Sequence, residues 1–271
     1  MKIASFLLSF ALISVTQGTA FAISKGIIGD DSRVLSHDPK VGRLHDSSGD
    51  AGCTGTLISQ SCAVTAGHCI STLYTIQFNT PENSFRGPVG SHSRDTYTID
   101  RKTIARENRP ATDEDWAVFQ IQKHKPVSKL ERWFASHFQK NSKIENYPMS
   151  EGYYPGAIQG FYEISAAPNS PGEEITITGY GSDTNLKMDR TQRSAEGKLL
   201  NISLRLSPFA LLYDVDTTSG TSGSALINKK TGKIIGVHNA FLRSYNMGTS
   251  INLATRFQDA INDCLRRENS N

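Results

Sequence analysis

A serine between glycines stands in the segment DTTSGTSGSAL, residues 216–226, and a serine in such a turn could act as a nucleophile. The hydroxyl of Ser222 would need a neighbouring base, usually a histidine, and a third group that fixes the tautomer of that base. His68, in AVTAGHC after a β-type run, is the candidate base. Asp115, where a polar loop enters the apolar run WAVFQI, is the candidate acid, whereas its neighbour Asp113 is expected to be solvated. Each segment alone is a weak signal, because loops of Ser, Thr and Gly are common.

The elements that must position these residues are short strands. Several apolar runs lie between turn signals, and many alternate polar and apolar residues or carry Val, Ile, Thr and Tyr: TGTLIS, CAVTAG, YTIQF, WAVFQIQ, EEITITGYG, GKLLNISLRL, SALIN, KIIGVHNAF and GTSINL. This pattern predicts an all-β protein, a sandwich or a pair of barrels. The final segment differs, because its apolar residues recur every three to four positions and predict an amphipathic helix over 253–267. Residues 127–172 have few strand signals and are interpreted as a long linker or insertion.

Length and composition exclude several classes of function. The 271 residues suit one large domain or two fused lobes. A net charge of +3, without a long run of Lys and Arg, gives no reason to expect a nucleic-acid partner. Neither an H-E-x-x-H metal motif nor a Gly-rich phosphate loop is found, so we expect no metal and no cofactor.

The N-terminus has the pattern of a secretory signal peptide over residues 1–22. Lys2 supplies a positive charge, an apolar core of 13 residues follows, and AFA at 20–22 is an A-x-A cleavage site. The alternative, a membrane anchor, is disfavoured because the apolar run is short for a bilayer and polar residues follow it. We therefore expect a secreted protein, extracellular or periplasmic, with no membrane contact once the signal is removed.

Four cysteines follow the signal segment, and an even number in an exported chain suggests disulfides. They are Cys53, Cys62, Cys69 and Cys264. Four cysteines allow three pairings, and their spacing alone does not choose among them.

Three blocks in the order His, Asp, Ser carry a resemblance to a known family. The blocks TGTLISQSCAVTAGHC, DEDWAV and GTSGSA resemble the trypsin/chymotrypsin-like serine peptidases. They are most similar to the bacterial glutamyl endopeptidase, or V8-like, branch, in which Gly-x-Ser-Gly-Ser replaces the animal motif. The resemblance covers about residues 26–263 and is weak over 127–172. It implies two six-stranded antiparallel β-barrels of the chymotrypsin type within a peptidase domain 26–271, with lobes at about 26–125 and 173–252 and a C-terminal α-helix.

The resemblance also implies roles for the site residues. Ser222 would be the nucleophile, His68 the general base and then acid, and Asp115 the group that orients the imidazole. The backbone N–H groups of Gly220 and Ser222 would form the oxyanion hole. The implied activity is hydrolysis of protein or peptide substrates through an acyl-enzyme, by a monomer. An inactive homologue that acts only by binding is the rival hypothesis, but such proteins usually lose a member of the triad.

Two further implications concern the cysteines. A cysteine directly after the histidine matches a family disulfide, which pairs Cys53 with Cys69. Cys62 and Cys264 could then form a second bridge, because the C-terminal helix of the fold packs near the strand before the histidine. The alternative is two buried free thiols.

The residues of the substrate pocket leave the specificity open. His238 and Thr217 match pocket residues that receive a carboxylate in the glutamyl branch, which implies cleavage after Glu or Asp. Asp216 stands where trypsin-type enzymes keep the aspartate that attracts Lys or Arg. The sequence favours the acidic preference without excluding the basic one.

Activation would also differ from the animal enzymes, because Thr221 replaces the acidic residue that receives the new N-terminal ammonium there. The segment GIIGDDSR resembles the mature start of glutamyl endopeptidases. Residues 23–25 would be a short pro-segment of a zymogen, with a cut after Lys25 that leaves Gly26 first or a cut one residue later. In that branch the freed amine helps to bind the acidic side chain.

Overall fold

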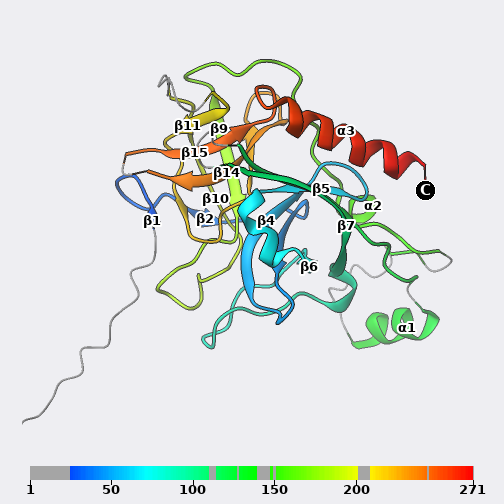
Figure 1. Cartoon of the computed structure of the whole chain (residues 1–271). Coiled ribbons are helices and arrows are strands. Elements are labelled where there is room, and N and C mark those ends of the chain that lie inside the picture. Colours follow the sequence, from blue (N-terminus) through cyan, green and yellow to red (C-terminus); the bar gives the residue numbers. More distant parts are fainter. Residues whose placement is uncertain are drawn as a thin grey trace, which may run out of the picture.

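The computed structural model describes residues 25–109, 114–126, 128–138, 147–148, 151–200, 208–242 and 244–270. The expected signal peptide, residues 23–24 of the expected pro-segment and Asp113 lie outside the described residues. Figure 1 shows two strand-rich lobes side by side, with the C-terminal helix α3 along one edge.

The first lobe is a closed antiparallel barrel with the strand order β3-β4-β5-β8-β7-β6. Its strands are β3 (Val41–His45), β4 (Ala51–Leu57), β5 (Cys62–Thr65), β6 (Thr75–Gln77), β7 (Thr96–Arg109) and β8 (Glu114–Ile121). Apolar side chains such as Leu57, Phe78 and Phe119 fill its interior and are fully buried. This lobe carries His68 and Asp115, at the ends of neighbouring strands.

Strand β8 is apolar from Trp116 to Phe119 and again at Ile121 because both of its faces are covered. Ala117, Phe119 and Ile121 point into the barrel interior. Trp116 and Val118 alternate with them and belong to a second cluster with α3 (Thr255–Asn269). The Trp116 ring stacks on Phe257 with a centroid distance of 5.0 Å. Packing on both faces thus fixes the strand at whose beginning Asp115 stands.

The second lobe is a seven-stranded antiparallel sheet with the order β11-β15-β14-β13-β9-β10-β2. Its strands are β2 (Val34–Leu35), β9 (Glu174–Gly179), β10 (Arg193–Lys198), β11 (Ala210–Tyr213), β13 (Ala225–Asn228), β14 (Ile234–Phe241) and β15 (Asn246–Ser250). When β2 is set aside, β11 and β10 are the two end strands of this order. They meet at the end of β10. There the Leu200 N–H donates to the Leu212 carbonyl at 2.8 Å, and the Asp214 N–H donates to the Lys198 carbonyl at 3.3 Å. These bonds bring the ends of the sheet together, so that it curls into a barrel-like second lobe.

The predicted all-β fold with two barrels and a C-terminal helix is confirmed. The structure adds that the chain start pairs with the second lobe, because β2 joins β10, and β1 (Lys25–Gly26) pairs with β12 (Thr217–Thr218). The C-terminal helix begins and ends two residues later than the sequence predicts.

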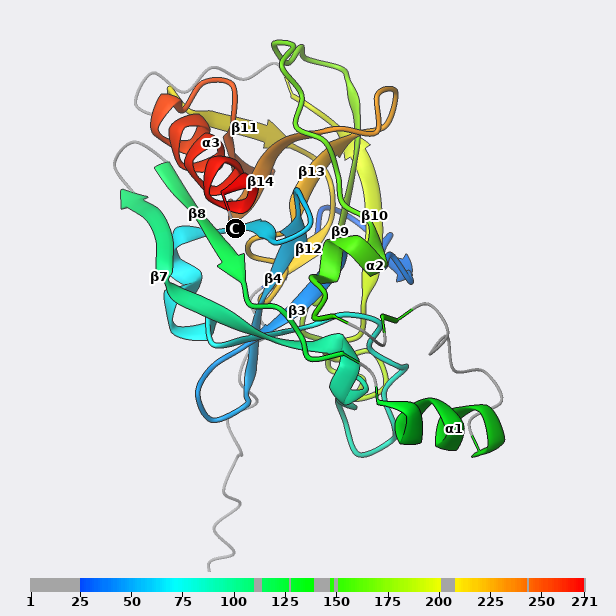
Figure 2. The ribbon, with the colours of Figure 1, turned by 90° about the vertical axis from the view of Figure 1, so that its right-hand side faces the viewer.

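The long segment 127–172 contributes two helices and no named strand among its described residues. These are α1 (Lys129–Phe138) and α2 (Pro155–Gln159), and Figure 2 places α1 at the periphery, away from both lobes. Two 3₁₀ turns, η1 (Gly67–Thr72) and η2 (Ser93–Asp95), complete the elements of the described residues. None of the helices in the described part of the chain is both long and apolar enough to cross a bilayer.

Candidate active site

His68 lies in the 3₁₀ turn η1, directly after β5. The turn passes so close to β7 that a Cβ on Gly67 would lie 1.8 Å from the Glu107 carbonyl oxygen, so only glycine fits there. The next residue, Cys69, is bonded to Cys53 of β4. A tight backbone contact on one side and a covalent bond on the other therefore hold the histidine.

Asp115 engages His68 with both carboxylate oxygens. The His68 backbone N–H donates to Oδ1 at 2.8 Å, and His68 Nδ1 lies 2.6 Å from Oδ2. Because a carboxylate only accepts, this contact holds the proton on Nδ1 and leaves Nε2 as the acceptor. The Asp115 backbone N–H donates to Thr249 Oγ1 of β15 at 3.0 Å, which ties the aspartate to the second lobe.

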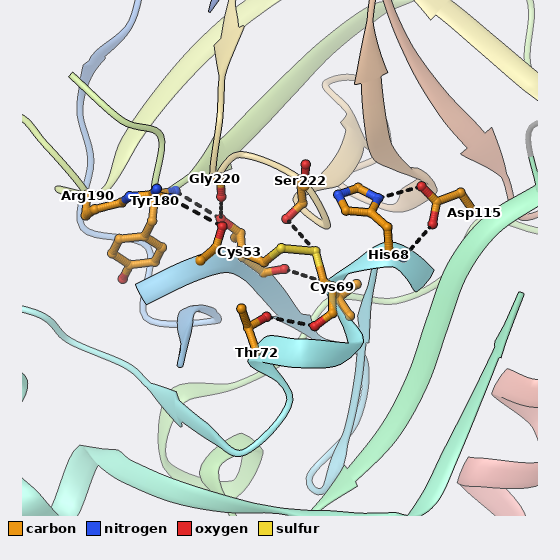
Figure 3. Close-up of a disulfide and its surroundings, with 12 residues drawn as sticks. Cys53, His68, Cys69, Thr72, Asp115, Tyr180, Arg190, Gly220 and Ser222 are labelled. Atoms are coloured by element: carbon orange, nitrogen blue, oxygen red, sulfur yellow. Dashed lines mark hydrogen bonds and ion pairs between the residues drawn. A yellow bond between two sulfur atoms is a disulfide. The ribbon is translucent and has the colours of Figure 1, made fainter. Parts of the chain in front are cut away.

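Ser222 approaches this pair from the second lobe, in the turn between β12 and β13. Figure 3 shows the imidazole between Asp115 and Ser222, with its second nitrogen on the serine side. The Ser222 carbonyl accepts the Thr54 N–H at 2.9 Å, so the turn is bonded to the first barrel. Among the described residues no hydrogen bond joins Ser222 Oγ to the ring, and in free enzymes this contact is often loose.

Two glycines give the serine turn its shape. Gly220 has φ 97° and Gly223 has φ 88°, in the left-handed region that favours glycine. A Cβ on Gly223 would lie 1.9 Å from Thr65 Oγ1, and one on Gly220 would lie 1.9 Å from Arg190 Nη1. Within the described part of the chain, the N–H groups of Gly220 and Ser222 have no acceptor. Two free backbone donors therefore stand beside the serine.

The disulfides are Cys53–Cys69 and Cys62–Cys264. The second joins β5 to α3. The two strands that directly precede His68 in the chain, β4 and β5, therefore each carry a bridged cysteine. Cys53, His68 and Cys69 also lie close enough together to form a group of metal ligands. The two sulfurs are bonded to each other, so the thiolates that a metal would need are not available.

Asp216 does not present a free carboxylate. Its Oδ1 accepts the Ile28 N–H at 2.7 Å, and its Oδ2 accepts the Ser32 N–H at 2.8 Å and the Ser32 hydroxyl at 2.7 Å. The residue is 4 % exposed. Asp216 therefore anchors the N-terminal segment, which runs beside β12.

His238 and Thr217 are both buried near the serine turn. The His238 carbonyl accepts the Gly223 N–H at 2.7 Å, and its ring Nδ1 lies 2.6 Å from the Tyr213 hydroxyl and 3.1 Å from the Met247 carbonyl. Burial lowers the pKa of His238 to about 3, so its imidazole is neutral. Thr217 Oγ1 is buried with no partner in the described part of the protein. The loop residue Thr221 receives the Thr218 N–H on its hydroxyl at 3.2 Å.

The structure adds residues that the sequence did not single out. Tyr213 holds the His238 ring, and the Asn246 side chain donates to the Gly26 carbonyl at 2.7 Å. Arg190 lies against Gly220, as described above, from a polar segment with no motif. The short apolar run FALLY, residues 209–213, is a signal that could have pointed to Tyr213.

Comparison with protein families identifies the lineage of this arrangement. The family model described as Trypsin matches residues 27–264. Comparison with curated protein sequences gave no match.

Several solved structures share the fold. A Glu endopeptidase has a TM-score of 0.64 at 21 % identity, over 88 % of this chain and 98 % of its own. A mutant of human heparin binding protein has a TM-score of 0.59 at 15 % identity, with coverage of 89 % and 97 %. A thermostable serine protease from an extremophilic microorganism has a TM-score of 0.57 at 14 % identity, with coverage of 84 % and 97 %. At these identities the likeness establishes the fold alone. Proteins named as peptidases and a protein named for heparin binding share it.

Proposed function

The chain belongs to the trypsin family, and we propose that it is a secreted serine endopeptidase that acts through Ser222, His68 and Asp115. The observation that carries the proposal is the pairing of both Asp115 oxygens with His68, next to a serine turn with two free N–H groups. A protein that only binds a partner would not need this arrangement.

The reaction follows from the donors and acceptors of the site. Ser222 Oγ attacks the scissile carbonyl while His68 Nε2 takes its proton, and Asp115 stabilises the imidazolium. The Gly220 and Ser222 N–H groups donate to the oxyanion. His68 then gives the proton to the leaving amine, which leaves an acyl-serine. Water, activated by the same imidazole, hydrolyses the ester and restores Ser222.

The direct test is labelling with a fluorophosphonate probe together with peptide hydrolysis. Ser222→Ala should remove labelling and lower hydrolysis by about 10⁴-fold or more, because loss of the nucleophile removes most of the acceleration. The circular dichroism spectrum should stay that of the wild type. Near-normal hydrolysis by the variant, or an unlabelled wild-type protein, would leave only a homologue that acts by binding.

For the specificity we propose cleavage after Glu or Asp. To receive a carboxylate, the neutral His238 ring would carry its proton on Nε2, with Nδ1 accepting the Tyr213 hydroxyl proton that otherwise goes to the Met247 carbonyl at 2.8 Å. Thr217 Oγ1 offers a second, unused hydroxyl. The basic alternative requires a free Asp216 carboxylate, whose oxygens here accept three hydrogen bonds from the N-terminal segment.

We further propose that the zymogen is cut after Lys25, which makes Gly26 the first residue. Two buried atoms without a partner among the described residues, Asn246 Oδ1 and Thr217 Oγ1, lie beside Gly26. A Cβ on Gly26 would lie 2.3 Å and 2.6 Å from them, so an ammonium there has acceptors within reach. Intact mass measurement of the secreted protein should give a chain that begins at Gly26, and a start at Ile27 would refute the cut.

A further inference from the structure

Two arginines near the oxyanion glycine, Arg190 and Arg43, form no ion pair within the described part of the chain. Arg190 is half-buried, and its Nη1 donates to the Gly52 carbonyl at 3.2 Å. Arg43 is 1 % exposed and donates to the carbonyls of Arg190 and Val89, to the Gln77 side chain and to His45 Nε2. All these acceptors are neutral. None of the carboxylates in the described ranges forms an ion pair with either arginine.

Such an arrangement is costly in the free protein. A buried charge normally has a counter-charge, because desolvation is otherwise uncompensated. Here burial lowers the pKa of both guanidinium groups. The nearby Asp189 charge partly opposes this effect at both arginines, but the carboxylate forms no ion pair with either and accepts the Asp183 N–H at 2.9 Å. Two positive charges beside a reaction centre, offset by this one carboxylate without an ion pair, indicate an anionic ligand.

The backbone supports the same interpretation. Arg190 has φ 56°, a left-handed conformation that a residue with a long side chain rarely adopts. This conformation places the guanidinium against Gly220, while Arg43 holds the Arg190 carbonyl at 3.1 Å. Arg43 thus supports the strained residue and adds a second charge behind it.

The position of Arg190 identifies which part of a substrate it would meet. In Figure 3 Arg190, Gly220, Ser222 and His68 follow one another, and the disulfide Cys53–Cys69 lies beneath. The acyl-side pocket residues Thr217 and His238 belong to strands of the second lobe, whereas Arg190 binds Gly52, the neighbour of Cys53 in the first barrel. The leaving amine takes its proton from His68, whose turn the disulfide holds, so the leaving peptide passes over this side.

We propose that Arg190, backed by Arg43, binds an acidic side chain at the first or second residue after the scissile bond. A guanidinium recognises a carboxylate through two parallel N–H donors, and Arg190 has donors left after its bond to Gly52. The proposal rests on the proposed peptidase function and adds a second acidic determinant, on the opposite side of the cleaved bond from the His238 pocket.

The test compares quenched fluorescent peptides that differ at one position on the leaving side. Each carries the acyl-side residue that the enzyme cleaves fastest, with Glu or Gln at the first or the second position after the bond. Wild-type kcat/KM should be about tenfold higher for Glu than for Gln at one of these positions, as expected for a charge-assisted contact. The ratio within one enzyme is the readout, so a general loss of activity cancels.

Three variants complete the experiment. Arg190→Gln should bring the Glu/Gln ratio close to one, and Arg190→Lys should retain part of it. The matched control Arg266→Gln removes an equal charge from the exposed end of α3 and should keep the wild-type ratio. The inference is overturned if the wild-type Glu/Gln ratio is near one at both positions, or if the ratio survives in Arg190→Gln. In either case hydrolysis of the peptides still supports the proposed peptidase function. If no peptide is cleaved and no fluorophosphonate label appears, the proposed function fails and the inference fails with it.

Discussion

His68 in the first barrel and His238 in the second lobe lie near the same serine in opposite environments. The His68 side chain is 37 % exposed and pairs with a carboxylate, whereas His238 is 2 % exposed and contacts a hydroxyl and a carbonyl. A carboxylate stabilises the protonated ring, while burial among neutral groups disfavours it. One histidine is therefore suited to take up and release a proton, and the other to remain neutral as a hydrogen-bond donor.

The largest effect should come from the partner of the exposed histidine. Asp115→Asn presents an amide to His68 Nδ1 and selects the wrong tautomer, so kcat should fall by about 10⁴-fold. Asp113→Asn, two positions earlier, is the control and should stay near the wild-type rate. Steady-state kinetics on one peptide measures both, and equal losses would remove the distinction between the two aspartates.

The buried histidine should affect selectivity rather than the reaction itself. His238→Ala should lower kcat/KM for cleavage after Glu, relative to cleavage after Leu, by about 10- to 100-fold, the value of a buried charge-assisted hydrogen bond. Matched peptides with Glu, Asp, Lys, Arg and Leu before the bond measure the ratio. A native preference for Lys or Arg would refute the acidic specificity and leave the triad untouched.

Asp216 tests whether the second lobe depends on the N-terminal segment. Asp216→Ala leaves the N–H groups of Ile28 and Ser32 without their acceptor, which should lower the free energy of unfolding by about 1–3 kcal/mol. Urea denaturation measures the change, and exposed Asp50→Ala serves as the control. Unchanged stability together with lost cleavage after Lys and Arg would instead make Asp216 a pocket residue.

The last prediction concerns the pH dependence of stability. The pKa of His238 falls from 6.5 to about 3 on folding, so between these values the unfolded chain binds more protons at this residue. Its contribution to stability is complete above pH 6.5 and is lost as pH falls toward 3, with a slope of at most about 1.4 kcal/mol per pH unit. Urea titrations from pH 7 to 4 should therefore give a shallower decline for His238→Gln, and parallel curves would contradict the assignment.

The sequence predicted what local patterns encode. Gly220 and Gly223 mark the serine turn because each stands where a side chain would collide, and β9 alternates as its burial requires. Strand β8 was recognised from an apolar run, which is present because both faces of the strand are packed against other elements. Motif spacing then brought His68, Asp115 and Ser222 into one family pattern.

What the sequence did not predict depends on distant contacts. Asp216 meets Ile28 across 188 positions, so its role could not be told from its neighbours in the chain. Strand β3 was missed because its buried positions include Arg43, and a polar residue within a strand gives no apolar signal. Arg190 lies in a segment without periodicity, where only the three-dimensional fold brings it to Gly220.

The bridge between Cys62 and Cys264 spans 202 positions of the chain. Any single cut between Cys69 and Cys264, for example within 127–172, yields two fragments that this bond keeps together as one molecule. Copies that nick one another in concentrated solution would therefore migrate as intact protein on a gel until a reductant separates the pieces. Self-digestion at such a position would break a peptide bond without separating the chain, and the two halves of the site would stay in one molecule after it.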